Sequence, residues 1–198
     1  MIVTEGEKTE PLYFKGLQKQ ILKKIGGNVN VIEKPTIDIY GQGASPSRLI
    51  EFTEKKVKEA KFMYQNVWVV FDKDDFDDFD QAIFEGEKKG YKIAWSNQSF
   101  EYWLYLHFHY SDTAEHRNEW NKKLDECFCI NELGDGKYKK NYENIYELLA
   151  SVDGISTAIK HAKRRMAQYS QGKQKPSKYD PGTTVYQLVE ELIKYIEE

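Results

Sequence analysis

The sequence predicts an α/β fold, with a parallel sheet flanked by helices and a mostly helical C-terminal lobe. Short apolar runs alternate with amphipathic segments over the first half of the chain, in the order β-α-β-α-β-α-β. The run at residues 67–71 is apolar at every position, which is typical of a strand covered on both faces in a parallel sheet. Right-handed crossovers would then place helices on both sides of that sheet.

The first strand is the short apolar run at residues 2–3. A helix follows, with Thr9 as its candidate N-cap and Pro11 tolerated in its first turn. Gly26 and Gly27 are expected to end this helix. Its inner face is an apolar series spaced by three and four residues: Phe14, Leu17, Ile21 and Ile25.

Extended structure is predicted next over residues 29–39, where Val29, Val31, Ile37 and Ile39 alternate with polar residues. The segment 41–43 is a loop, and Ser45 before Pro46 marks the start of a second helix. The inner face of that helix comprises Leu49, Ile50, Thr53 and Val57.

The apolar strand stops at Asp72, and a helix is expected over about residues 79–89. Residues 91–95 form the next strand, which Ser96 and Asn97 end. We assign residues 1–105 to the α/β domain and residues 106–198 to the helical lobe.

A helix capped by Ser99 is expected where the two parts join. The pattern at residues 111–140 is weak and polar. Helices are predicted over 142–150 and 156–169, and a loop over 170–181. The last helix has Thr183 or Thr184 as its cap and an apolar face made by Val185, Leu188, Val189, Leu192, Ile193 and Ile196.

Composition narrows the function. The chain has 198 residues and a net charge of −3. Its overall charge therefore does not attract nucleic acid, and any such attraction would need a local basic patch. No apolar run approaches the ~20 residues that cross a bilayer, and no signal peptide is seen, so we expect a cytoplasmic protein without a membrane partner. Cys127 and Cys129 and the four histidines do not match a zinc spacing, so a metal site would be built from carboxylates and would take Mg²⁺, Mn²⁺ or Ca²⁺.

Polar residues follow three strands of the predicted sheet. Glu5 follows the first strand, Asp72 and Asp74 the central one, and Ser96 and Asn97 the last. Because ligands bind beyond the carboxyl ends of parallel strands, we expect these side chains to face one crevice. The alternative is that the aspartates from residue 72 to residue 80 form only a solvated turn.

A basic stretch lies in the second half. Seven Lys or Arg residues and no acidic residue occur between residues 160 and 178. Lys163, Arg164 and Arg165 are candidates to contact nucleic acid, although a solvated helix face would look the same. His107 lies on an apolar helix face, where core packing is the simpler interpretation.

Three ordered motifs, at residues 3–11, 70–76 and 96–108, resemble the RloB-like family, and the resemblance extends to residues 183–185. Members of that family are often encoded beside restriction and phage-defence genes. Gln98 departs from the pattern, because members more often have Pro there.

The resemblance implies a Toprim-like fold, in which a Glu after the first strand and an Asp-x-Asp after a later strand bind Mg²⁺. Glu5 would be that Glu, and Asp72 and Asp74 the Asp-x-Asp. Glu10 is similar to a second glutamate of the nuclease branch. Glu101 belongs to the family's own third motif, and the resemblance assigns no role to it or to His107.

The leading hypothesis is therefore a metal-dependent phosphodiesterase, specifically a nuclease, with one or two Mg²⁺ or Mn²⁺ ions at Glu5, Asp72 and Asp74. Glu5 or Glu10 would accept the proton. Candidates for substrate binding, besides the basic stretch, are Lys8, Lys73, Asn97 and Glu101.

Two alternatives stay open. One is a non-enzymatic module that binds a nucleotide, nucleic acid or protein in a defence system, with a partner from a neighbouring defence gene. The other is a phosphohydrolase with Asp72 as nucleophile. The sequence does not select DNA over RNA, and it does not give an oligomeric state.

Overall fold

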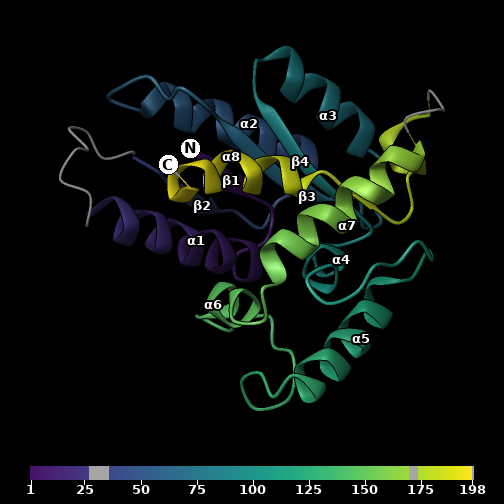
Figure 1. Cartoon of the computed structure of the whole chain (residues 1–198). Helices are drawn as coiled ribbons and strands as arrows, with labels where there is room; N and C mark the ends of the chain where they lie inside the picture. Colours follow the sequence, from purple (N-terminus) through teal and green to yellow (C-terminus); the bar gives the residue numbers. More distant parts are fainter. Residues whose placement is uncertain (27–35, 170–173, 198) are drawn as a thin grey trace.

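The computed structural model describes residues 1–26, 36–169 and 174–197, and its centre is a five-stranded sheet (Figure 1). The strand order is β2-β1-β3-β4-β5. The first four strands are parallel, and β5 runs antiparallel to β4 at the edge. The predicted α/β class is confirmed. The strands are β1 (Ile2–Thr4), β2 (Ile39–Gly41), β3 (Trp68–Asp72), β4 (Lys92–Asn97) and β5 (Gly182–Thr183).

Alternation along the strands divides the core into two layers. Val3, Val69 and Phe71 point to one face, where helices α2 (Pro46–Glu59) and α3 (Phe79–Lys88) cover them. Because both faces of β3 are covered, this strand is apolar at every position before Asp72.

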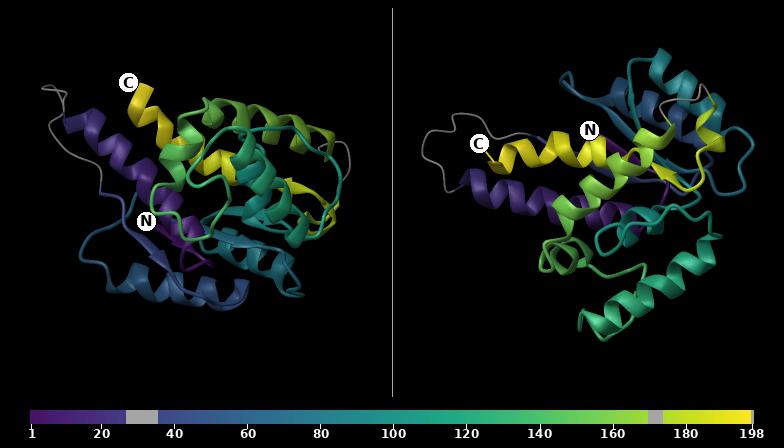
Figure 2. Two further views of the ribbon diagram at one scale, coloured as in Figure 1. Left: turned by 90° about the horizontal axis from the view of Figure 1, so that it is seen from below. Right: turned by 45° about the vertical axis from the view of Figure 1, so that its right-hand side comes forward.

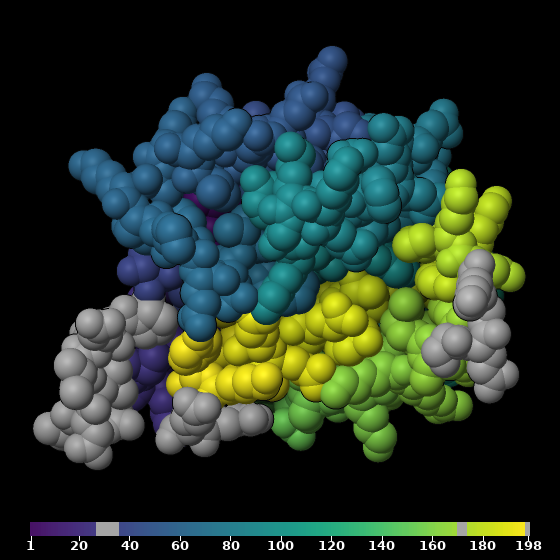
Figure 3. Space-filling view, turned by 90° about the horizontal axis from the view of Figure 1, so that it is seen from above, coloured from purple at the N-terminus to yellow at the C-terminus, as the bar shows by residue number. Residues whose placement is uncertain are grey.

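The opposite face carries Ile2, Trp68 and Val70, and helices α1 (Thr9–Gly26) and α8 (Val185–Glu197) pack on it. Helix α8 lies beside both β4 and α7, between which it fills a band in the space-filling view (Figure 3). The predicted apolar face of this last helix packs on the core. Val185, Leu188 and Val189 are fully inaccessible, whereas Ile193 and Ile196 are partly buried.

The remaining helices extend this second layer on the side away from α2 and α3 (Figures 1 and 2). Their buried residues join those of the sheet in one cluster, so no gap in the core separates the two parts of the chain. The division near residue 105 stays a prediction, although β5 and α8 complete the sheet from the C-terminal part. These elements are α4 (Phe100–Tyr105), α5 (Arg117–Ile130), α6 (Ile145–Ala150), α7 (Gly154–Tyr169) and the 3-10 turn Pro176–Lys178.

The structure corrects three local predictions. The segment expected to be weakly patterned contains a full helix, α5. Thr9 is not a cap; it lies inside α1, and its hydroxyl donates to the Lys140 carbonyl at 2.9 Å. Strand β5 was not predicted. Val29 and Val31 lie outside the described residues.

Candidate functional site

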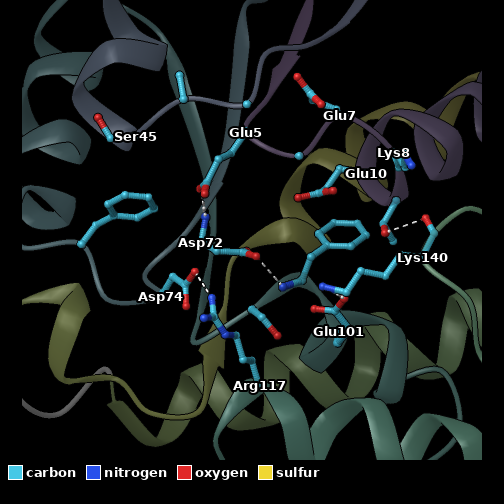
Figure 4. Close-up of a pocket in the computed structure, with 17 residues that line it drawn as sticks. Glu5, Glu7, Lys8, Glu10, Ser45, Asp72, Asp74, Glu101, Arg117 and Lys140 are labelled. Carbon is cyan, nitrogen blue, oxygen red and sulfur yellow. Dashed lines mark hydrogen bonds and ion pairs between the residues drawn. The ribbon is translucent and has the colours of Figure 1, made fainter.

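A cavity of about 510 Å³ opens at the carboxyl ends of the parallel strands. It is bounded by the segment after β1, the start of α1, the loop after β3, the start of α4 and two segments from the second half of the chain (Figure 4). Six carboxylates and three basic side chains line it, so the described lining carries an excess of acid. They are Glu5, Glu7, Glu10, Asp72, Asp74 and Glu101, with Lys8, Arg117 and Lys140.

Hydrogen bonds join Glu5 directly to the end of β3. The Glu5 amide donates to the Val70 carbonyl at 2.8 Å, which continues the pairing of β1 with β3 beyond the strand. In return the Asp72 amide donates to Glu5 Oε2 at 3.0 Å. Asp72 Oδ2 accepts from the Phe100 amide at 2.9 Å, which ties the end of β3 to the start of α4.

Glu10 reaches the same space from the first turn of α1 and is buried. Its carboxylate lies against Gly6, where a Cβ atom would be 1.9 Å from Glu10 Oε2. Glycine at position 6 therefore makes room for this side chain. In Figure 4 Glu10 points toward Glu5 and Asp72, whereas Glu7 and Lys8 point away.

Burial changes the acidity of these groups. Loss of solvent raises the pKa of Glu5 to about 7, and nearby carboxylates, Glu10 first among them, add to the rise. Burial followed by the charge of Glu101 raises the pKa of Glu10 to about 7. The pKa of Asp72 is also raised, by desolvation and then by Glu10 and Glu5.

Asp74 and Arg117 form an ion pair at the edge of the cavity. Asp74 has a positive φ of 39°, a backbone region that Asp tolerates better than most residues. Its amide donates to the Gln98 carbonyl at 3.0 Å, so the end of β4 holds this turn in place. Arg117 is the first residue of α5.

Glu101 lies on α4 and is buried beside Lys140. Lys140 Nζ is 2.9 Å from Glu101 Oε1, and the Tyr138 hydroxyl donates to the same oxygen at 3.2 Å. The Thr9 hydroxyl holds the Lys140 backbone, so the start of α1 positions this lysine at the cavity.

Six residues that the sequence offered as site candidates line the cavity: Glu5, Lys8, Glu10, Asp72, Asp74 and Glu101. Ser96 and Asn97 do not line the cavity, against the expectation for the last strand. The Ser96 hydroxyl pairs with Thr183 in β5, and the Asn97 amide donates to the Ser177 carbonyl at 3.1 Å. Ser96 thus contacts the added edge strand and Asn97 the 3-10 turn that precedes it, and the sequence revealed neither element.

Lys73 also lies outside the cavity lining, with its ammonium near the Asp74 carbonyl. Lys163, Arg164 and Arg165 of α7 also lie outside the cavity lining, and each contacts another part of the protein. Lys163 pairs with Glu190, and the Arg164 guanidinium lies 4.0 Å from the Tyr110 ring centre. Arg165 donates to the Pro181 carbonyl at 2.8 Å.

Sequence reasoning missed Arg117 and Lys140, and it treated Ser99 only as a cap. Arg117 begins a helix whose apolar residues Trp120, Leu124 and Phe128 recur every four residues, a signal that predicts the helix and not its position at the cavity. Lys140 follows no periodic segment, and only the fold brings it to the cavity.

The carboxylate oxygens of the cavity are the kind of ligand that hard divalent cations prefer. The carboxylates also outnumber the basic side chains of the lining, so a cation would balance their charge. As the side chains lie, no group of three potential ligands within the described chain is arranged to hold a metal ion. Asp74 faces Arg117 instead, so metal binding at Glu5, Asp72 and Asp74 would require that pair to open.

A family model described as RloB-like protein matches residues 1–192. The chain belongs to the RloB-like family. The three motifs that carry the resemblance contain all six carboxylates of the cavity, and the family match covers each of them.

Searches of curated proteins and of solved structures gave no match. In the described parts of this RloB-like chain, no helix combines the length and apolar character needed to span a membrane.

Proposed function

We propose that this RloB-like chain is a Mg²⁺- or Mn²⁺-dependent phosphodiesterase that cleaves nucleic acid, acting in defence against phage. One observation carries the proposal. Glu5, Glu10 and Asp72 come from separate elements and converge at the carboxyl end of the parallel strands, where ligands of such sheets bind. The resemblance to Toprim nucleases and the common place of the family's genes beside defence systems support the same function.

Glu5, Asp72 and Asp74 would hold the cation. A bound divalent ion supplies Lewis acidity at the phosphate and lowers the pKa of a coordinated water. Carboxylates whose pKa is raised by burial and mutual repulsion gain from a positive charge at this position.

Glu10 is suited to accept a proton. A general base works best when its pKa is near the operating pH, and burial raises the pKa of Glu10 to about 7. Gly6 and the first turn of α1 fix the direction of this side chain. Glu5 has a similarly raised pKa, but it is bound to the Asp72 amide, so it is better placed to hold the ion.

A second function is favoured by a specific observation. Arg117 and Lys140 each form an ion pair with a carboxylate of the cavity, Asp74 and Glu101 respectively. An ion-paired cavity of this kind would also suit a non-enzymatic module that binds a nucleotide, nucleic acid or protein from a neighbouring defence gene.

Cleavage assays distinguish the nuclease from the non-enzymatic binding module. The wild-type protein, Glu5→Gln and Asp72→Asn would be incubated with single-stranded DNA, duplex DNA and RNA, in Mn²⁺ and in chelator. We expect cleavage of at least one substrate that needs Mn²⁺ and falls by about a hundredfold or more in both variants, which corresponds to about 2.7 kcal/mol of transition-state stabilisation.

Exposed Asp77 provides the control, and Asp77→Asn should keep wild-type activity. Tight binding of a substrate without its cleavage in Mn²⁺ would select the non-enzymatic module. Equal cleavage by wild type and both variants would show that the activity does not come from this site.

A further inference from the structure

We propose that Ser99, Arg117 and Lys140 form a subsite that binds a phosphate group of the substrate beside the carboxylates. The inference rests on the proposed function, which supplies the cation. It adds the residues that recognise the anion, and it predicts that ion and anion each strengthen the binding of the other.

Ser99 provides the first observation. It lies in the wall of the cavity, is 4 % exposed, and precedes α4. Its hydroxyl is buried and has no hydrogen-bond partner within the described chain, and it does not cap the helix. Because a buried hydroxyl without a partner costs stability, an unused donor at a cavity wall points to a ligand.

Arg117 provides the second. One of its terminal nitrogens pairs with Asp74, and the side chain is 41 % exposed, so part of the guanidinium stays accessible from the cavity. A guanidinium has five N–H groups in a planar fork that matches two oxygens of a phosphate. Arg117 can therefore contact a phosphate through donors that Asp74 does not use.

Lys140 provides the third. Its side chain is 60 % exposed although its partner Glu101 is only 4 % exposed, so the ammonium lies at the boundary between the buried acid and solvent. The Thr9 hydroxyl fixes its backbone at 2.9 Å. With its backbone fixed by Thr9 and its ammonium next to Glu101 at the cavity mouth, Lys140 can contact an incoming anion.

The balance of charge links these residues to the cation. Six carboxylates and three basic groups line the cavity, so an anion entering the cation-free protein meets net repulsion. A divalent ion at Glu5, Asp72 and Asp74 would take over from Arg117 as the counter-charge of Asp74. The freed guanidinium would then turn to the phosphate. Ion and phosphate should therefore bind with positive coupling.

Calorimetric titration with thymidine 3′,5′-bisphosphate as probe tests the subsite. In saturating Mg²⁺ we expect Arg117→Gln and Lys140→Gln to weaken probe binding by about tenfold each, and Ser99→Ala by about threefold. The wild type should bind the probe at least about tenfold more tightly in Mg²⁺ than in chelator. Arg117→Gln should bind Mg²⁺ alone more tightly than the wild type, because its competitor at Asp74 is gone.

Lys92→Gln is the matched control. Lys92 pairs with Glu191 outside the cavity, and the two side chains are 44 % and 25 % exposed, against 41 % and 25 % for Arg117 and Asp74. This variant should bind ion and probe as the wild type does. Arg117→Lys keeps the charge and should recover part of the probe affinity, which guards against a folding defect in the glutamine variant.

Wild-type probe affinity in both Arg117→Gln and Lys140→Gln, with Mg²⁺ binding retained, would overturn the subsite and leave the metal centre intact. A wild type that binds no Mg²⁺ would contradict the proposed function instead. In that case, weaker probe binding by both variants in chelator would still support the anion subsite.

Discussion

Glu5 and Glu10 show at the scale of the residue how the fold sets the chemistry of a side chain. Both are ordinary glutamates that follow a short strand, yet burial raises the pKa of each to about 7. The sequence placed them near the end of the strand, but it could not reveal their loss of solvent. That property depends on α4 and on the segment around Lys140, which close the cavity from the other half of the chain.

The raised pKa of Glu5 predicts a pH-dependent stability in chelator. Between about pH 4.5 and pH 7 the folded protein holds a proton on Glu5 that the unfolded chain has lost, so the unfolding free energy falls as pH rises. His107 opposes this trend, because burial lowers its pKa to about 4 and the folded state gains stability between pH 4 and pH 6.5.

Comparison with Glu5→Gln isolates the carboxyl group. Urea unfolding would be measured at pH 5 and pH 8. The unfolding free energy of the variant, relative to that of the wild type, should be higher at pH 8 than at pH 5 by roughly 1 to 3 kcal/mol. Glu87 is exposed, so the difference in unfolding free energy between Glu87→Gln and the wild type should be the same at pH 5 and pH 8. An unchanged difference between Glu5→Gln and wild type across this range would mean that Glu5 titrates as a solvated acid.

Gly6 provides a steric prediction. A methyl group at this position would meet the Glu10 carboxylate, whereas one at Gly26 would meet nothing within 4 Å. We expect Gly6→Ala to lower the unfolding free energy by about 1 to 3 kcal/mol and to lower cleavage activity. Gly26→Ala should be neutral or slightly stabilising, since alanine favours helices. Equal stabilities of the two variants would show that Glu10 moves aside at no cost.

At the scale of elements, periodicity predicted the parallel strands and most helices, because these segments have one or two clearly apolar faces. Helix α5 has such a face as well, but charged residues between its apolar positions obscured it. Strand β5 has only two residues, too few for any periodic signal, and it exists because it pairs with β4. Ser96 contacts this strand and Asn97 contacts the 3-10 turn before it, and neither side chain lines the cavity.

Helix α8 gives the prediction at this scale. Leu188 is fully buried between the sheet and its neighbouring helices, so Leu188→Ala removes packing that the core cannot easily refill. We expect a loss of about 2 to 5 kcal/mol in unfolding free energy, measured in urea. Exposed Lys194→Ala should change it by less than about 0.5 kcal/mol. A small effect at Leu188 would mean that α8 is not an integral part of the core.

At the scale of the whole molecule, the cavity is assembled from both halves of the chain. The motifs revealed its carboxylates, but Arg117 and Lys140 follow from tertiary structure alone. By contrast, Lys163, Arg164 and Arg165, which belong to the basic stretch that is conspicuous in the sequence, contact other protein groups. A cluster of charges in a sequence does not say which of them has a partner.

Salt dependence distinguishes these two sets of cations. On duplex DNA each neutralised phosphate contributes about 0.9 to the slope of log K against log salt. We expect Arg117→Gln and Lys140→Gln each to reduce the slope by about that amount. A variant with Gln at positions 163, 164 and 165 should keep it, because these side chains already have protein partners. A lower slope in this triple variant would restore α7 as a nucleic-acid contact.

Thermal unfolding of wild type and Asp72→Asn, in chelator and in Mn²⁺, tests the metal centre most directly and needs no substrate. A cation that binds only the folded wild type raises its stability by about 2.7 kcal/mol at a hundredfold excess over Kd. Asp72→Asn should be at least as stable as wild type in chelator, since one repelling carboxylate is gone, and should respond little to Mn²⁺. Exposed Asp77→Asn should respond as wild type does. If Asp72→Asn instead melts lower in chelator and keeps the Mn²⁺ response, Asp72 serves only to hold the Phe100 amide, and the metal centre loses its central ligand.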